Sequence, residues 1–447
     1  MEGQKLRVLI VGAGIGGLTA ALALSREGHE VLVFEKSKFA AEIGAAIGLA
    51  ANCTSILRKI GFEPEEHGSS ICNLVCTLVN FGHILQKTLL NGYKQWTMYN
   101  SAGKCLVKQE IPSKLQSERF YFIHRAHLHS ALKHQVLQQG DTGSELVQLH
   151  LSCDITSLDI QNGQLTLSDG RKYHGDAIIG ADGVHVRTLC TKSGVATNER
   201  QSFTRQYIDA HKKVFPFRKH CYRWLSPRST MADDNRTSEY AKLGISLTEW
   251  MGNDRRIICY PCADGEMLNL VAIVPSEEVE AAAIEAESPQ HKKKGMLKSF
   301  ETFGDGAKAV LEQAPEEDLK VWPLLDMEPL EKWSEGRLAL IGDACHPFTP
   351  FMGQGAAMAI EDAVTLAILL RRGTLAEEVP ERLKLLQVCR KERADRIQDY
   401  ARRNGQDAGD SQRGQPTPNE FRGWTAYANQ HNAWEHAERV LQRSLSA

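Results

Sequence analysis

The stretch Leu6-Arg-Val-Leu-Ile-Val-Gly-Ala-Gly-Ile-Gly-Gly17 decides the fold of this chain. Its first half is a largely apolar run of strand length, and a glycine-rich turn follows directly. A helix is then predicted over Leu18–Arg26 with Gly28 as its stop, and a second buried strand over Val31–Phe34, which leads into Glu35. Strand, helix and strand form one βαβ unit with a right-handed crossover.

Each glycine of Gly12-x-Gly14-x-x-Gly17 has a mechanical reason to be there. They permit, in turn, a tight bend, a close approach of the backbone to a pyrophosphate, and close packing of helix on strand. Glu35 lies eighteen residues after Gly17, where it can accept from a ribose hydroxyl. A carboxylate there favours an unphosphorylated ribose, so NAD and the ADP half of FAD both remain open, beside the plainer reading of a structural turn.

The composition excludes several classes of protein. The chain has 447 residues, 53 Lys+Arg against 55 Asp+Glu, 42% hydrophobic and 24% charged residues, which is typical of a globular protein of two or three domains. The near-neutral charge argues against nucleic-acid binding. No apolar run reaches the roughly 20 residues that a membrane span needs.

The expected location is the cytoplasm, because the N-terminal residues carry no secretory signal pattern. The eleven cysteines are an odd number spread over a long chain, so reduced thiols are expected rather than a disulfide framework. Cys259 and Cys262 have C-x-x-C spacing, but Pro261 interrupts it and no second pair stands nearby. No metal site is predicted.

Two further glycine-containing signatures follow strand-like runs. Residues 180–187 read Gly-Ala-Asp-Gly-Val-His-Val-Arg and include Asp182. Residues 342–356 read Gly-Asp-Ala-Cys-His-Pro-Phe-Thr-Pro-Phe-Met-Gly-Gln-Gly-Ala, and place Asp343 at a strand end before a helix. That carboxylate can accept from polyol hydroxyls, and the helix start can face a delocalised anion. The plainer readings are an Asp-Gly turn and a permissive helix entry.

The three signatures in this order, with Glu35 and Arg125, resemble the FAD-dependent aromatic hydroxylases, the group A flavoprotein monooxygenases of the para-hydroxybenzoate hydroxylase type. The resemblance runs from about residue 5 to 372. It is nearest to the salicylate-hydroxylase-like branch and its fungal natural-product relatives, on the stretches at 42–48, 124–125 and 260–262.

The resemblance implies a role for each matching residue. The pyrophosphate of FAD would lie on Gly12, Gly14 and Gly17, and its adenosine ribose on Glu35. Gly48 would lie beside the flavin, and the backbone of Gly353, Gln354, Gly355 and Ala356 would contact the isoalloxazine. Arg125 would reach the phosphate or ribityl region, and Asp343 the ribityl chain. Asp182 belongs to a motif that serves both FAD and NAD(P)H in the family.

The sequence departs from the family pattern at three places. His185 stands where the family usually has Ser, Ala46 replaces a glycine, and Ala51-Asn52 replaces Pro-Asn. The first change puts the NAD(P)H role of its loop in doubt. Neither of the other two changes removes a group that performs chemistry.

The resemblance also implies the fold and the domains. The expected fold class is α/β, α+β mixed: a Rossmann-like FAD-binding domain, an inserted and mostly antiparallel β-sheet substrate domain, and a C-terminal helical segment. The expected ranges are 1–71, 104–189 and 300–372 for the FAD-binding domain, 72–103 and 190–299 for the substrate domain, and 373–447 for the helical region with a loop at 405–420.

Two residues are candidates for substrate chemistry. Arg223, in His220-Cys-Tyr-Arg-Trp-Leu225, resembles an arginine that reaches the substrate oxygen in the fungal relatives, and Tyr260 resembles the tyrosine beside it. A guanidinium offers a charged fork of donors to a phenolate, and a tyrosine hydroxyl can donate alongside it. The alternative is a surface arginine on a strand and a core aromatic.

The expected function is that of a FAD-dependent monooxygenase of secondary metabolism. With NADPH or NADH and O₂ it would hydroxylate an aromatic or electron-rich ring through a C4a-hydroperoxyflavin. One alternative applies the same chemistry to oxidative dearomatisation, epoxidation or rearrangement of a polyketide or indole alkaloid. Another is a non-catalytic flavin-binding protein that docks through aromatic residues near Trp424. The preferred nicotinamide, the substrate and the oligomeric state, monomer or dimer, stay open.

Overall fold

The computed structural model describes most of the chain. The residues described are 4–38, 46–67, 95–110, 120–138, 146–184, 186–190, 196–242, 246–279, 289–407 and 416–446. His185, most of the 42–48 stretch and residues 72–94 of the expected substrate domain lie outside them.

Six strands form the first sheet, in the order β19-β20-β11-β1-β2-β7. The pairs from β20 to β7 are parallel, and β19 adds an antiparallel edge. Because both faces of the central strands are covered, these strands are almost continuously apolar. The strands are β1 (Arg7–Val11), β2 (Glu30–Phe34), β7 (Val147–His150), β11 (Ala177–Gly180), β19 (Ser334–Glu335) and β20 (Leu338–Leu340).

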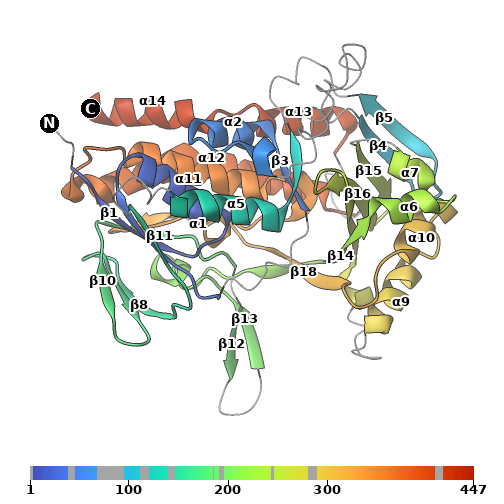
Figure 1. Cartoon of the computed structure of the whole chain (residues 1–447), viewed down its shortest axis with the longest axis horizontal. Coiled ribbons are helices and arrows are strands. Elements are labelled where there is room, and N and C mark those ends of the chain that lie inside the picture. Colours follow the sequence, from blue (N-terminus) through green and yellow to red (C-terminus); the bar gives the residue numbers. More distant parts are fainter. Residues whose placement is uncertain are drawn as a thin grey trace.

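Helices cover one face of this sheet, and a small antiparallel sheet lies on the other side (Figure 1). The helix after the glycine turn, α1, packs between the other two helices of its layer. The helices are α1 (Ile15–Arg26), α5 (Arg125–Gln138) and α11 (Gly355–Leu369), and the strands of the small sheet are β8 (Ile155–Asp159), β9 (Gln164–Leu167) and β10 (Lys172–His174). The predicted Rossmann-like arrangement is confirmed.

A second sheet of seven strands has the order β18-β14-β17-β16-β15-β4-β5. All of its pairs are antiparallel except β15 with β4. The strands are β4 (Gln95–Asn100), β5 (Cys105–Glu110), β14 (Phe215–Pro227), β15 (Ser246–Met251), β16 (Arg256–Cys262), β17 (Met267–Pro275) and β18 (Lys320–Asp326). The sheet thus draws β5 and β18 from ranges assigned by sequence to the first domain, whose boundaries stay a prediction.

The two faces of the second sheet meet different partners. On one face, Tyr222 and Trp224 of β14 belong to a core shared with α9 (Pro289–Ser299) and α10 (Asp305–Glu312). Because side chains alternate along a strand, Cys221 and Arg223 point to the opposite face. There Cys221 packs in a cluster with Phe351, which belongs to the third signature. This face is therefore turned towards the first domain.

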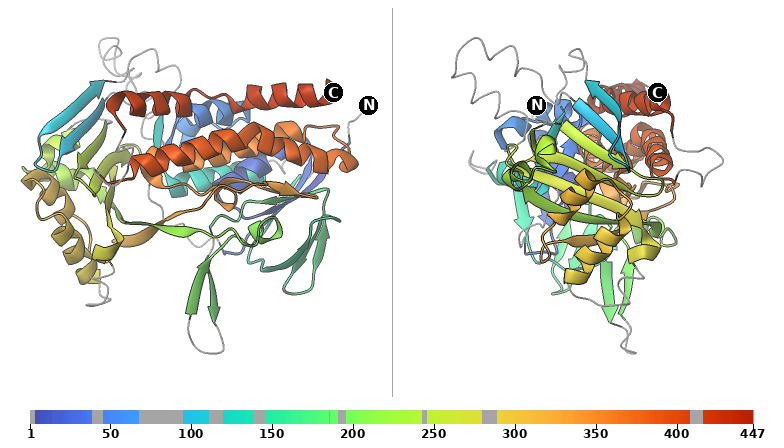
Figure 2. Two further views of the ribbon diagram at one scale, coloured as in Figure 1. Left: turned by 180° about the vertical axis from the view of Figure 1, so that it is seen from behind. Right: turned by 90° about the vertical axis from the view of Figure 1, so that its right-hand side faces the viewer.

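Short elements connect the two sheets and extend outwards. The pair β3 (Ala46–Leu49) and β6 (Tyr121–His124) lies beside the second sheet. The hairpin of β12 (Val186–Cys190) and β13 (Ala196–Arg200) projects from the body of the molecule (Figure 2). The helix predicted over Leu18–Arg26 is present as α1, which begins three residues earlier, at Ile15, and ends at Arg26.

A buried group of charges fixes the C-terminal helices to the first domain. On α11, Glu361 accepts from Arg393 Nε at 2.9 Å and Nη2 at 2.8 Å, and pairs with Arg390; Asp362 accepts from Arg390 Nε at 2.8 Å. Both arginines lie on α12 (Val379–Asn404), and all four side chains are at most 4% exposed. Two anions and two cations neutralise each other away from the protein surface.

The charges in this cluster are strongly coupled. Burial alone would raise the pKa of both carboxyls, but Arg390 and Arg393 lower the pKa of Glu361 to about 2. His346 and Arg390 lower the pKa of Asp362 to about 2. The cluster therefore stays ionised at physiological pH.

The C-terminal aromatic residues are packing residues. Trp424, on α13 (Pro418–Asn429), stacks on Tyr400 at 4.7 Å and is buried, and Ala437, on α14 (Ala433–Ser446), is fully buried. The Arg403 guanidinium covers the Trp424 ring at 4.5 Å. The Trp424 ring is thus not available as a docking surface. Among the helices described, none is long and apolar enough to cross a membrane.

Removing one cation of the buried cluster should destabilise the folded protein strongly. We expect Arg393→Ala to lower the free energy of unfolding by about 3–5 kcal/mol, because Glu361 is left buried with an unbalanced charge. The control is Lys384→Ala on the same helix, whose exposed pair with Glu381 should contribute less than about 1 kcal/mol. Chemical denaturation followed by circular dichroism measures both, and equal losses would contradict this view of the cluster.

A histidine beside the cluster should make stability depend on pH. Burial lowers the pKa of His431 from 6.5 to about 3, so the folded protein favours the neutral ring. Its contribution is complete above pH 6.5 and is lost progressively as the pH falls from 6.5 towards 3. Between pH 7.5 and 5.5 we expect a loss of about 1 kcal/mol that His431→Gln reduces. An identical pH profile in the variant would contradict this assignment.

Candidate cofactor and substrate site

The glycine turn has the shape that a phosphate group requires. A Cβ on Gly12, whose φ is +101°, would lie 2.5 Å from the carbonyl oxygen of Ala181, and a Cβ on Gly17 would lie 2.0 Å from that of Gly12. Those two glycines are therefore required by the fold itself. A Cβ on Gly14 would meet no described atom within 4 Å. Gly14 is also the N-cap of α1, and no side chain caps the first N–H groups of this helix.

Glu35 lies beside this turn, and its contact with a ribose hydroxyl stays a prediction. Its Oε2 accepts from the backbone N–H of Ala13 at 2.8 Å, and its Oε1 accepts from Ser37 N–H at 2.8 Å. His129 of α5 contacts the same turn, since its Nε2 lies 2.7 Å from the carbonyl oxygen of Ala13. The loop is thus held from two sides. His129 was not identified from the sequence, because a buried histidine on a helix carries no motif.

Asp182 of the second signature is committed to the chain itself. Its Oδ1 accepts from the hydroxyls of Ser202 at 2.7 Å and Thr204 at 2.5 Å, and its Oδ2 accepts from Thr204 N–H at 3.1 Å. Thr204 also lies over Gly180, where a Cβ would come within 2.2 Å of its Oγ1. The carboxylate anchors the segment after the second signature, and any contact of Asp182 with a cofactor stays a prediction.

Asp343 and Arg125 are brought together from distant parts of the chain. Asp343 lies in the short helical turn η5 (Gly342–Ala344) after β20, and Arg125 begins α5. Burial raises the pKa of the Asp343 carboxyl, while His346, Arg125 and Arg205 lower it. Both Asp343 and Arg125 are nevertheless exposed in the structure. A polyol could reach this carboxylate.

The third signature ends in an uncapped helix start. Gly353 has φ +61°, and a Cβ there would meet no described atom within 4 Å. The N-cap of α11 is Gln354, with no side-chain cap, so the first N–H groups of the helix, near Gly355 and Ala356, are available to a ligand. The side chain of Gln354 points elsewhere, because it accepts from Asn52 at 3.2 Å and donates to Asn429 at 3.0 Å.

Position 48 must be glycine, because an aromatic ring occupies the space that a side chain would need. It lies on β3 opposite Phe122, and a Cβ there would come 2.7 Å from the ring of Phe120. The Phe122 ring stacks in turn on Tyr260 at 4.4 Å. The glycine therefore allows a layer of aromatic rings to form beside the second sheet. Its predicted place beside the flavin stays a prediction.

Arg223 and Tyr260 lie on one face of the second sheet. Val271 opposite Arg223 and Asn269 opposite Tyr260 are two residues apart on β17, so all four side chains point the same way. The Arg223 charge lowers the pKa of Tyr260, which burial raises, so the two groups are close. The Nε of Arg223 has no hydrogen-bond partner in the part of the chain that the structure describes. Its guanidinium retains donor capacity for a ligand.

The hydroxyl of Tyr260 connects the two domains. It donates to the carbonyl oxygen of Ala46 at 2.6 Å, and the side-chain oxygen of Asn269 accepts from the Ala46 N–H at 2.9 Å. The second sheet thus holds β3 through both backbone groups of one residue. In this conformation the Tyr260 proton is directed at Ala46 rather than at a ligand.

The residues present fit FAD. An open, uncapped helix start at Gly14, a carboxylate at Glu35, an exposed carboxylate at Asp343 and a second uncapped helix start at Gln354 match pyrophosphate, ribose, polyol and flavin in turn. The turns at Gly14, Glu35 and Asp343 follow the carboxyl ends of β1, β2 and β20 of the first sheet.

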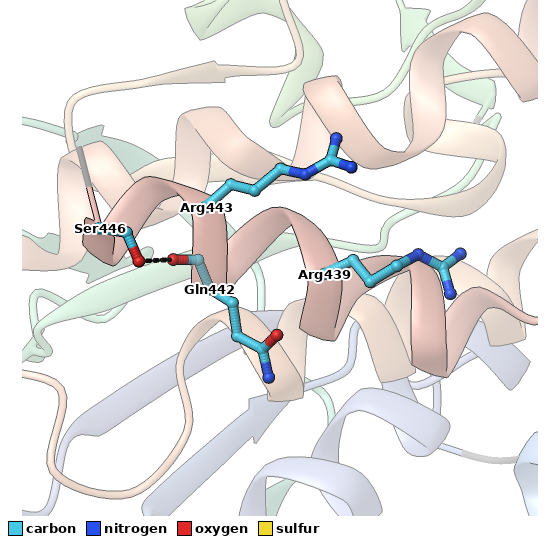
Figure 3. Close-up of a pocket in the computed structure, with 4 residues that line it drawn as sticks. All are labelled: Arg439, Gln442, Arg443 and Ser446. Carbon is cyan, nitrogen blue, oxygen red and sulfur yellow. Dashed lines mark hydrogen bonds between the residues drawn. The ribbon is translucent and has the colours of Figure 1, made fainter.

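A depression on α14 offers no comparable arrangement. It is lined by four exposed residues of that single helix, Arg439, Gln442, Arg443 and Ser446 (Figure 3). Ser446 donates to the carbonyl oxygen of Gln442 at 2.9 Å, and no other element contributes a lining group. Within the described residues there is also no group of three or more His, Cys, Asp or Glu side chains placed to hold a metal ion.

Comparison with protein families decides the family. Residues 166–403, more than half of the chain, match the FAD binding domain family, and residues 10–41 match the NAD(P)-binding Rossmann-like domain. The chain belongs to the FAD binding domain family. The predicted cofactor, FAD, is confirmed with it.

Curated relatives and solved structures agree with the family. A FAD-dependent monooxygenase, cfoG, of Aspergillus candidus is 29% identical over 88% of this chain and 84% of its own length. Hispidin-3-hydroxylase of Neonothopanus nambi is 29% identical over 88% and 86%. The crystal structure of CtdE in complex with FAD and a substrate has a TM-score of 0.73 and 20% identity, covering 99% of this chain and 100% of that one. The predicted enzyme class, a FAD-dependent monooxygenase, is confirmed.

Two substitutions should separate the roles of the family's glycines. We expect Gly14→Val to leave the melting temperature of the FAD-free protein unchanged, because the site is open and extended, but to weaken FAD binding at least tenfold. Gly17→Ala should destabilise the FAD-free protein, since its Cβ would overlap the carbonyl of Gly12. Thermal melting and FAD titration measure both. Normal FAD binding by the Gly14 variant would remove its assigned role.

Proposed function

We propose that this enzyme hydroxylates an aromatic ring that bears a hydroxyl or another ionisable oxygen, with a reduced nicotinamide and O₂ as co-substrates. The observation that supports this is the position of Arg223 on the sheet face turned towards the third signature. A cation there suits a phenolate, whose electron-rich ring is the form that reacts with activated oxygen. The relatives named as monooxygenase and hydroxylase support the same reaction class.

The residues would divide the work between binding and shielding. When bound, FAD would supply the redox and oxygen-transfer chemistry, with electrons from the nicotinamide and oxygen from O₂. Arg223 would hold the ring oxygen as its anion and so orient the neighbouring carbon. The apolar face around it, with Val271, Phe122 and the Tyr260 ring, would keep water away. Tyr260 would act through Ala46, by fixing β3 against the sheet.

The co-substrates and the metabolic role of the enzyme follow from the same reaction class. We propose a small aromatic molecule, NADPH or NADH, and O₂ as the partners, and a role in cytoplasmic secondary metabolism. The fungal sources of the two relatives support the last point. Addition of one oxygen without loss of aromaticity is the expected product, and its mass and spectrum distinguish it from dearomatised, epoxidised or rearranged products.

Substitution of Arg223 should separate flavin reduction from ring oxidation. We expect Arg223→Ala to lower product formation about 100-fold while nicotinamide oxidation continues and the electrons appear as peroxide, because the phenolate loses its cation. Arg218→Ala, at an 83% exposed arginine of the same strand, is the matched control and should keep wild-type yield. Equal product yields from the two variants would remove Arg223 from the site.

Substitution of Tyr260 tests its link to Ala46. Tyr260→Phe keeps the ring stacked on Phe122 and removes the hydrogen bond. We expect flavin reduction to persist and product per nicotinamide oxidised to fall several-fold, because β3 is less firmly held. Product yield and peroxide measured in the same reaction check this. Unchanged yield would show that the hydroxyl has no part in the reaction.

The reaction itself is tested by nicotinamide consumption in air across phenols, hydroxybenzoates, polyketide aromatics and indoles. A substrate-stimulated rate with one oxygen atom added to the product is expected. Peroxide as the only product with every compound would contradict the proposed substrate class while leaving the cofactor in place.

A further inference from the structure

Gln354 carries a buried amide between two glycines. The sequence Gly353-Gln354-Gly355 leads into α11, and the Gln354 side chain is only 4% exposed. Glycine leaves the backbone free to turn and offers no side chain that could hold it. The direction of the first N–H groups of α11 therefore depends on how the Gln354 side chain is held. A buried carboxamide needs partners for both its oxygen and its nitrogen.

The two partners of this carboxamide come from distant parts of the chain. Its Oε1 accepts from Nδ2 of Asn52, on α2 (Ala51–Lys59), at 3.2 Å. Its Nε2 donates to Oδ1 of Asn429, the last residue of α13, at 3.0 Å. The two helices lie in contact on the same side of the molecule (Figure 1). Each partner takes one half of the amide, so neither can replace the other.

The first partner is fixed by the buried charge cluster. Asn52 is 1% exposed, and its Nδ2 also donates to Oε1 of Glu361 at 2.5 Å. This hydrogen bond ties Asn52 to the body of α11, the helix whose start Gln354 precedes. The oxygen end of the Gln354 amide is thus held by α2 and α11 alone.

The second partner is fixed through Arg393. The guanidinium of Arg393, which binds Glu361, also donates to the carbonyl oxygens of Tyr427 at 3.0 Å and Ala428 at 2.7 Å. These carbonyls come immediately before Asn429, at the end of α13. Helix ends leave such carbonyls without partners, so a buried cation there holds the end of the helix in place. Asn429 lies beyond residues 166–403, the range that matches the family.

The contacts form a closed path from the body of α11 back to its own start. The path runs from Glu361 through Arg393 to the end of α13, and from Asn429 through Gln354 to the N-cap of α11. Because both ends of this path lie on one helix, a shift of α13 would turn the Gln354 side chain. The backbone between the two glycines would turn with it.

We propose that Asn429 is a positioning residue for the isoalloxazine of FAD: through the Gln354 carboxamide it holds the N–H groups at the start of α11 in the direction that the flavin requires. The inference rests on one part of the function, the flavin contact implied for residues 353–356. An uncapped helix start favours negative charge, so it should bind the anionic, reduced flavin more strongly than the oxidised one. Loss of Asn429 should therefore weaken the reduced complex more.

The test combines FAD titration of the FAD-free protein with the reduction potential of the FAD-loaded protein. For Asn429→Leu we expect about tenfold weaker binding of oxidised FAD, because one hydrogen bond to Gln354 is lost. A further tenfold loss for reduced FAD would lower the two-electron potential by about 30 mV. Asn429→Asp keeps an oxygen that accepts from Gln354, and should bind oxidised FAD as the wild type does.

Two controls separate positioning from general destabilisation. Asn432→Leu is the matched variant, because Asn432 accepts from the Glu435 N–H at 3.2 Å rather than from Gln354. It should leave the reduction potential unchanged. In the Gln354→Leu background, Asn429→Leu should change neither the FAD affinity nor the potential, because the carboxamide through which Asn429 acts is absent. Melting temperatures show that each variant is folded.

The failures are distinguishable. Gly353→Asp places a carboxylate in the open space beside the helix start, and a wild-type potential in this variant would remove the flavin from residues 353–356. If Gly353→Asp lowers the potential but Asn429→Leu does not, or lowers it equally in the Gln354→Leu background, the role of Asn429 alone is overturned. If Asn429→Leu does not fold, Gln354→Leu decides, since a wild-type potential there contradicts the proposal.

Discussion

The rest of the structure depends on a neutral cluster of buried charges centred on α11. Glu361 and Asp362 are adjacent on this helix, and each is matched by an arginine of α12. Asp362 also accepts from the backbone N–H of Gly342 at 3.0 Å, so the same carboxylate that pairs with Arg390 fixes the start of the Asp343 turn. An isolated charge could not remain at this depth. The cluster therefore determines at once where the C-terminal helices lie and how the third signature is presented.

The cofactor site is built from turns that the fold holds at strand ends rather than from side chains that reach for a ligand. Gly12 and Gly17 are required by close backbone contacts, whereas Gly14 and Gly353 leave space. The carboxylate of Asp182 accepts hydrogen bonds from hydroxyl and backbone donors of the chain itself. Such a division allows the open positions to accept a large anionic molecule without the frame changing shape.

The sequence predicted the βαβ unit and the turns that follow buried strands at the three signatures, because glycine spacing and apolar runs are local rules. It could not predict Arg205, His129 or the Ala46 bridge, since each depends on which buried groups meet across long sequence distances. It also did not show that the Gln354 side chain turns away from the helix start towards Asn52 and Asn429. Sequence rules describe turns well, but they do not show which distant groups complete them.

The contacts of Arg393 have a consequence for the order in which the protein folds during synthesis. This arginine donates to the carbonyl oxygens of Tyr427 at 3.0 Å and Ala428 at 2.7 Å, at the end of α13, while it also binds Glu361. The first βαβ unit can form as soon as it emerges from the ribosome. Its helix α1 packs on α11, however, and the buried partners of α11 are complete only when residue 428 is also available. During synthesis from the N-terminus the nucleotide-binding fold is therefore begun early and completed late, because residues about 400 positions apart in the sequence must both be present.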